Sequence, residues 1–152
     1  MAERLIYHFI NDDDFLHISN KIKEFELKTA GEISVSIKEK RKFSQRNKSI
    51  KEIAEEEFFR LGINKTRDNT GILIFLILTD RQFHIMADKG IHEKVTDTTW
   101  EDIKNQIQNF FVKGKFAEGL SWGVEEVGKI LAKHFPIKPD DTNEISNRVV
   151  LS

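Results

Sequence analysis

The sequence predicts an α/β fold in which a mixed β-sheet is covered by helices. Residues 71–78 are a glycine followed by seven apolar residues, the length of a strand that is buried on both faces. Residues 32–37 alternate polar and apolar side chains, as a strand with one buried face does. Because a helical segment separates these two strands, we expect a parallel pair with a right-handed crossover. Residues 82–87 follow a short turn and join as the antiparallel partner of a hairpin.

Four segments have the apolar spacing of amphipathic helices: residues 12–29, residues 49–61, a segment that opens near Thr98, and residues 116–134. Two of them begin with the pattern of a capping box, in which a hydroxyl and a carboxylate three residues apart satisfy free helical N–H groups. These pairs are Ser49 with Glu52 and Thr98 with Glu101. The order of helices and strands is that of a single α/β domain.

Length and composition describe an ordinary globular chain. With 152 residues it is long enough to bury a core, and we expect one domain over residues 1–135 and a loosely ordered tail over residues 136–152. The chain has no cysteine, which excludes disulfides and thiolate ligands. No apolar stretch reaches the roughly 18 residues of a membrane span, and the N-terminus lacks a signal-peptide core. We therefore expect a cytoplasmic protein with no membrane span, and a monomer.

Four carboxylates are predicted to lie at one edge of the sheet. Glu32 starts the first strand and Asp68 precedes the second. Asp88 follows the antiparallel strand, which returns to the same edge, and Asp97 comes only nine residues later. Carboxylates that converge without cationic partners repel one another unless a cation is bound or some stay protonated, and oxygen ligands favour calcium or magnesium. These residues are therefore a candidate metal site; the alternative is that Asp68 and Asp97 only form caps and turns.

Other polar patterns leave two interpretations open. At the opposite edge of the sheet, Asp80 and Arg81 form a hairpin turn, or else an anion site built on Arg81. Residues 38–51 hold seven Lys or Arg against one Glu, with Phe43 among them. They form either a solvated loop or a surface for a nucleic acid or an acidic partner, and the net charge of −1 argues against nucleic acid.

The sequence contains no recognisable catalytic motif. The five histidines lack metal-ligand spacing, and phosphate-binding glycine loops and a nucleophile elbow are missing. Without a nucleophile beside an activating base, the residues alone do not decide whether the protein is an enzyme.

An ordered set of segments resembles the TPM domain family, which is named for a plant thylakoid lumen protein, a photosystem II repair protein and an animal acetylcholine-receptor regulator. The matching segments are Thr29-Ala30-Gly31-Glu32-Ile33-Ser34-Val35, Asp68-Asn69-Thr70-Gly71-Ile72-Leu73-Ile74, Asp80-Arg81-Gln82-Phe83-His84-Ile85, Gly90-Ile91-His92-Glu93-Lys94-Val95-Thr96-Asp97, and residues 116–123. Together they cover roughly residues 10 to 134.

The resemblance implies a Rossmann-like three-layer sandwich with a central mixed sheet of about four strands between helices. It also implies calcium binding in some members and a proposed phosphatase activity. Carried over residue by residue, Glu32, Asp68, Asp88 and Asp97 fall at the acidic cleft of the family. The sequence departs from many members at Ala87-Asp88, where they have a glycine, and in lacking a signal peptide and a membrane anchor, so we expect no periplasmic or lumenal role.

Three hypotheses follow from the sequence. The first is a domain that binds a divalent cation, calcium or else magnesium, through the four carboxylates. The second is a metal-assisted phosphatase, in which the cation polarises a phosphoryl oxygen and activates water. The third is an interaction module that recruits a protein partner through the basic loop or the tail.

Overall fold

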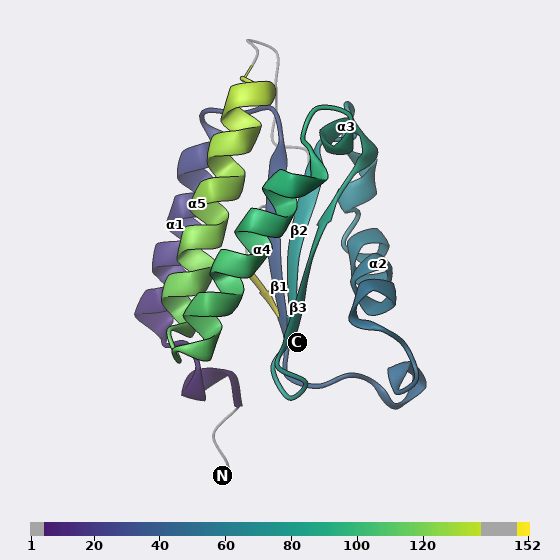
Figure 1. Cartoon of the computed structure of the whole chain (residues 1–152), viewed down its shortest axis with the longest axis vertical. Coiled ribbons are helices and arrows are strands. Elements are labelled where there is room, and N and C mark those ends of the chain that lie inside the picture. The colour runs from purple at the N-terminus through teal and green to yellow at the C-terminus, as the bar shows by residue number, and fades with distance from the viewer. Residues whose placement is uncertain (1–4, 138–148) are drawn as a thin grey trace.

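The computed structural model describes residues 5–137 and 149–152, and over these residues the chain forms a three-layer sandwich (Figure 1). Within them four strands form one sheet in the order β3-β2-β1-β4. The strands are β1 (Glu32–Lys38), β2 (Gly71–Ile77), β3 (Gln82–Ala87) and β4 (Val149–Leu151). β1 is parallel to both β2 and β4, whereas β3 is antiparallel to β2. The predicted mixed sheet and its hairpin are therefore confirmed.

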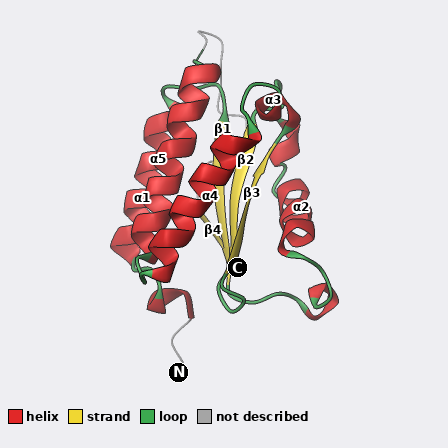
Figure 2. Cartoon of the chain, in the orientation of Figure 1, coloured by secondary structure: helices red, strands yellow, loops and turns green. Residues whose placement is uncertain are grey.

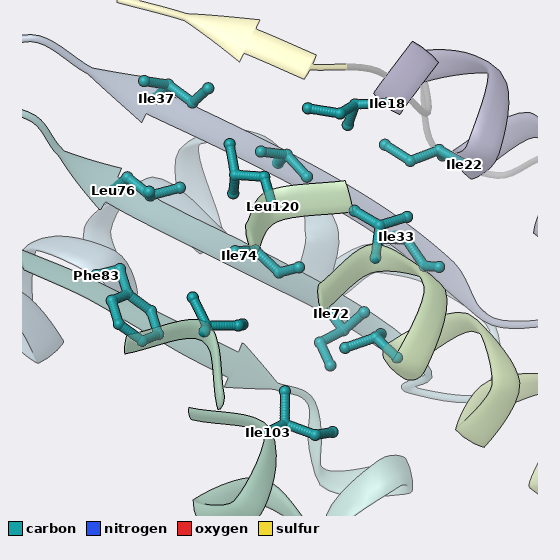
Figure 3. Packing of buried hydrophobic residues seen from close by; sticks show 14 of the residues in the cluster. Ile18, Ile22, Ile33, Ile37, Ile72, Ile74, Leu76, Phe83, Ile103 and Leu120 are labelled. Atoms are coloured by element: carbon teal, nitrogen blue, oxygen red, sulfur yellow. The ribbon is translucent and has the colours of Figure 1, made fainter. Parts of the chain in front are cut away.

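Three long helices cover one face of this sheet, as Figure 2 shows. They are α1 (Asp12–Glu26), α4 (Asp97–Val112) and α5 (Phe116–His134). The apolar side chains of β1 and β2 that point to this face are buried against them. Figure 3 shows Ile33, Ile72 and Ile74 of the sheet in the same cluster as Ile18 of α1 and Leu120 of α5, with Leu120 over Ile74. This layer holds the larger of the two apolar clusters.

The other face of the sheet is covered by α2 (Ile50–Arg60) and the short η3 helix (Ile63–Lys65). Ile53 and Phe58 of α2 pack against Leu73 and Phe75 of β2, and all four side chains are almost completely buried. β2 is thus buried on both faces, as its length and composition predict.

Of the two capping boxes predicted from the sequence, the structure contains one and lacks the other. Ser49 and Glu52 form the predicted capping box of α2, with the Glu52 N–H donating to Ser49 Oγ at 3.1 Å. The predicted box at Thr98 and Glu101 is wrong, because α4 already begins at Asp97. The 3₁₀ helices η1 (Leu5–His8) and η2 (Phe43–Gln45) and the short helix α3 (Lys89–His92) were not predicted.

The last part of the chain carries a strand that the sequence analysis did not predict. Pro136 pairs with Thr29 in an isolated antiparallel bridge, and Val149–Leu151 adds to the edge of β1 as β4. Residues 138–148 of the predicted loose tail lie outside the described residues. Among the helices that the structure describes, none has the length and apolar character needed to cross a bilayer.

Candidate functional site

The predicted acidic edge is the end of the sheet where β1 and β2 begin and β3 ends. Glu32 lies opposite Gly71 in the parallel register, and its N–H donates to the Thr70 carbonyl at 3.1 Å. On the other side of β2, the Asp88 N–H donates to the Gly71 carbonyl at 2.9 Å. Backbone hydrogen bonds therefore join the three segments directly at this edge, near the top of Figure 1 beside α3.

A close backbone contact fixes the turn before β2 against α3. The Gly90 N–H donates to the Asn69 carbonyl at 3.0 Å. A Cβ atom on Gly90 would lie only 2.5 Å from the Asp68 carbonyl oxygen and 2.6 Å from that of Asn69. Only glycine fits here, and the fit leaves two carbonyl oxygens facing α3. Asn69 has a φ of 57°, a left-handed conformation that asparagine tolerates well.

Asp88 is the N-cap of α3, and only one of its two carboxylate oxygens accepts a hydrogen bond from the described residues. Oδ1 accepts a hydrogen bond from the Lys89 N–H at 2.8 Å. Oδ2 is buried and has no hydrogen-bond partner among the described residues. A buried carboxylate oxygen without a donor is unfavourable, so this atom requires an explanation.

The other three predicted ligands have different surroundings. Glu32 is buried, with 3% of its surface exposed. Asp68 is exposed and lies 3.8 Å from Arg67 Nε, and Asp97 is the exposed first residue of α4. Within residues 5–137 and 149–152, no group of three or more His, Asp or Glu side chains is placed to hold a metal ion. The four residues thus share one edge of the fold without forming one side-chain cluster.

A groove of about 460 Å³ extends from this edge along β3, between α2 and α4. Its titratable lining residues are Lys51, Glu55, His84, His92, Asp97, Glu101 and Lys104. Burial lowers the pKa of His84, and the positive charges of Lys104 and Lys51 lower it further. Trp100 also lines the groove, and its Nε1 is buried without an acceptor among the described residues.

Sequence reasoning singled out Asp97 but missed the other groove residues. His84, in the middle of β3, lies half-buried in the groove wall. The position of β3 at the edge of the sheet could have indicated the groove, because the polar residues of an edge strand border open space on one side instead of a neighbouring strand.

The basic loop is held against the molecule by its own arginine. Arg41 Nε donates a hydrogen bond to Asp80 Oδ2 at 2.8 Å, and Arg41 Nη2 forms an ion pair with the same oxygen at 2.7 Å. Its Nη1 also donates to the carbonyls of Gln45 and Lys48, at 2.9 and 2.7 Å. Asp80 therefore joins the hairpin turn to the loop, which agrees with the interpretation of residues 79–81 as a turn.

The fold and the acidic edge define a small α/β sandwich domain with polar residues at the starts of its parallel strands. A model of the TPM domain family matches residues 7–130. The chain therefore belongs to the TPM domain family.

Solved structures agree with this assignment. The BA42 protein of the psychrophilic bacterium Bizionia argentinensis is 33% identical, with 95% of this chain and 96% of that chain covered and a TM-score of 0.83. The N-terminal domain of a P. gingivalis protein is 19% identical, with 84% of this chain and 79% of that chain covered and a TM-score of 0.69. The N-terminal domain of the cg2496 protein of Corynebacterium glutamicum is 14% identical, with 91% and 84% covered and a TM-score of 0.62. The last two similarities concern the fold alone, and no curated protein matched the chain.

Proposed function

We propose that this TPM domain binds a divalent cation, with calcium preferred over magnesium, at the edge of the sheet around Asp88. The observation that carries the proposal is Asp88 Oδ2, a buried carboxylate oxygen with no hydrogen-bond donor among the described residues. A cation beside this oxygen would replace the missing donor and remove the energetic penalty of its burial.

The neighbouring groups supply the ligand chemistry of a hard cation. The carbonyl oxygens of Asp68 and Asn69 face α3, and the Asp68 carboxylate is exposed and attached to the same turn. Glu32 begins the adjacent strand, and Asp97 begins α4 close by in sequence. All of these candidate ligand atoms are oxygens, which favours calcium or magnesium over zinc. A site that combines carboxylates with backbone carbonyl oxygens suits the larger and more flexible coordination shell of calcium better than that of magnesium.

Calorimetric titration of calcium into metal-stripped protein, with excess magnesium present, tests the proposal. We expect heat from a single site, with a Kd of about 10⁻⁵ M or tighter if the site works at intracellular calcium levels. Asp88→Asn is the informative variant, because asparagine is also a good N-cap and α3 keeps its cap while the charge is lost. It should weaken calcium binding at least tenfold, as should Asp68→Asn combined with Asp97→Asn.

The matched control is Asp13→Asn, which removes an equal charge from the exposed first turn of α1. Its calcium affinity should stay within about twofold of the parent. Absence of heat, full competition by magnesium, or equal losses in Asp13→Asn and Asp88→Asn would contradict the assignment of the site.

The groove along β3 favours a second candidate function, the hydrolysis of phosphate esters. The groove opens beside Asp97 and carries Lys51, Lys104 and His92, cationic or proton-carrying groups suited to a phosphoryl group. A cation at the acidic edge would polarise the phosphoryl oxygen, while Lys51 and Lys104 would hold the ester. Metal-dependent turnover of an aryl phosphate that disappears in both Asp88→Asn and Lys104→Gln supports this function. Turnover that is unchanged in both variants identifies a contaminant.

A further inference from the structure

A second pocket lies at the opposite end of the sheet, beside the turn that joins β2 to β3. It has a volume of about 620 Å³, within the range of small-molecule sites. Its apolar lining comes from the residue after η1, from the end of β2 and the residue that follows it, from α4 and from the start of α5. It includes Phe9, Leu76, Leu78, Phe111, Val112 and Phe116. The rings of Phe111 and Phe116 stack with centroids 4.9 Å apart, and Phe9 packs on Phe116 at 5.2 Å. The aromatic wall is therefore already assembled.

Among the described residues, the polar lining of this pocket carries only neutral or positive groups. These residues are Arg81, His8, Gln82 and Gln108, and no described aspartate or glutamate lines the pocket. The nearest carboxylate along the chain, that of Asp80, is paired with Arg41 through the hydrogen bond and ion pair described above. Arg81 itself makes no side-chain hydrogen bond or ion pair with the described part of the chain. The rim of an apolar pocket thus holds a guanidinium whose charge no residue in the described part of the chain neutralises.

The backbone of Arg81 gives an independent reason to look for a role. Arg81 has a φ of 52°, a left-handed conformation in which glycine and asparagine are favoured and long side chains are not. Its N–H closes the turn by donating to the Leu78 carbonyl at 3.1 Å, a bond that any residue would make. A strained arginine at a position suited to glycine indicates that its side chain is used.

From these observations we propose that the pocket binds an amphipathic anion, a carboxylate carried on an apolar chain such as a medium-chain fatty acid. The chain lies on the stacked rings of Phe111 and Phe116, and the carboxylate accepts hydrogen bonds from the Arg81 guanidinium. The position agrees with the tendency of α/β sheets to bind ligands beyond the carboxyl ends of their parallel strands, where β2 ends at Ile77. This site is independent of the acidic edge, which lies at the other end of the same strands (Figure 1).

The test uses two probes with the same apolar chain, decanoate below its micellar concentration and uncharged decanol, titrated into the whole protein by calorimetry. Arg81→Gly removes the cation and relieves the left-handed strain. We expect it to weaken decanoate binding about tenfold, the range of one charge-assisted interaction, and to leave decanol affinity within about twofold. Its thermal midpoint should be no lower than that of the parent, so a loss of binding cannot be attributed to unfolding.

A second pair of variants tests the charge selectivity of the site. Val112 lines the pocket and is 76% exposed, so Val112→Glu places a negative charge on the rim without disturbing the core. It should weaken decanoate more than decanol, whereas Leu16→Glu, at an exposed position of α1 that does not line the pocket, should change neither. Failure of the parent to bind decanoate, or equal losses of decanoate and decanol in Arg81→Gly, would overturn the proposal.

Discussion

Gly90 offers the most direct test of how the acidic edge is built. Gly90→Ala would place its Cβ 2.5 Å from the Asp68 carbonyl oxygen, against the 3.4 Å at which ordinary van der Waals contact begins. Both nearby oxygens belong to the backbone of a turn that is bonded to β1 and α3, so no side-chain rotation can relieve the clash. The turn must move away from α3, and the hydrogen bond from Gly90 to Asn69 is lost or lengthened.

The magnitude follows from three contributions. Overpacking at a rigid contact costs about 1–3 kcal/mol, and the lost hydrogen bond adds about 0.5–1.5 kcal/mol. Replacing glycine by alanine within a helical turn returns up to about 1 kcal/mol. We therefore expect the free energy of unfolding to fall by about 2 kcal/mol, within a range of about 0.5–4.5 kcal/mol, and the thermal midpoint by roughly 4–8 °C at the central value.

Urea denaturation at 25 °C measures this change, with two controls. In Gly31→Ala the added Cβ would meet only the end of the Leu131 side chain, at 3.0 Å, so the neighbour can rotate and the loss should be smaller. Lys89→Ala changes the adjacent exposed residue of α3 and should be close to neutral. A Gly90→Ala protein as stable as the parent would refute the view that the turn before β2 is held rigidly against α3.

Two further predictions concern the layers on either side of the sheet. The pKa of Glu57 is raised by burial but is lowered overall, because Arg60 and Ser36 donate hydrogen bonds to its carboxylate at 2.6 and 2.5 Å. The ionised carboxylate therefore stabilises the fold above the unfolded pKa of about 4.3, and this stabilisation is lost as the pH falls through the lower folded pKa. In urea denaturation, Glu57→Gln should lower the free energy of unfolding by about 1–3 kcal/mol at pH 7. The difference in stability between this variant and the parent should shrink toward pH 3. On the opposite face of the sheet, the Cβ of Gly128→Ala would lie 2.4 Å from the Phe25 ring, so thermal denaturation should show a loss of stability of about 1–2 kcal/mol. Phe25→Leu should partly recover this stability in the double variant. Additive losses in the double variant would contradict a direct contact between the two residues.

The sequence predicts the fold well because each main element has a local signal. The apolar run of β2, the alternation in β1 and the capping box at Ser49 are all contained in a few consecutive residues, and the structure confirms each of them. β4 has only three residues, and its pairing with β1 is decided by contacts far apart in sequence. No local pattern distinguishes such a strand from a loop.

The site could be predicted only to the level of the sheet edge. Topology brings Glu32, Asp68 and Asp88 to the same end of the sheet, because a hairpin returns the chain to the edge where β2 began. The directions of the side chains do not follow from topology. That Asp88 caps α3 through one oxygen and buries the other depends on a helix of four residues, Lys89–His92, which has no periodicity to reveal it. Similarly, the anion binding proposed for Arg81 depends on the pairing of Asp80 with Arg41, two residues that lie 39 positions apart in the sequence.

The two proposed sites follow from the two ends of the β2–β3 hairpin. At the open end, the start of β2 and the end of β3 must both lie beside the start of β1, so acidic residues from three segments gather there. At the closed end, a tight turn between antiparallel strands requires a left-handed residue, and the chain has an arginine there instead of a glycine. One end therefore concentrates negative charge and the other a single positive charge, although the chain as a whole is nearly neutral. Because β2, which connects the two ends, is buried and carries no ionisable side chain from Gly71 to Ile77, each end can select its own proposed ligand by charge: a cation at Asp88 and an anion at Arg81.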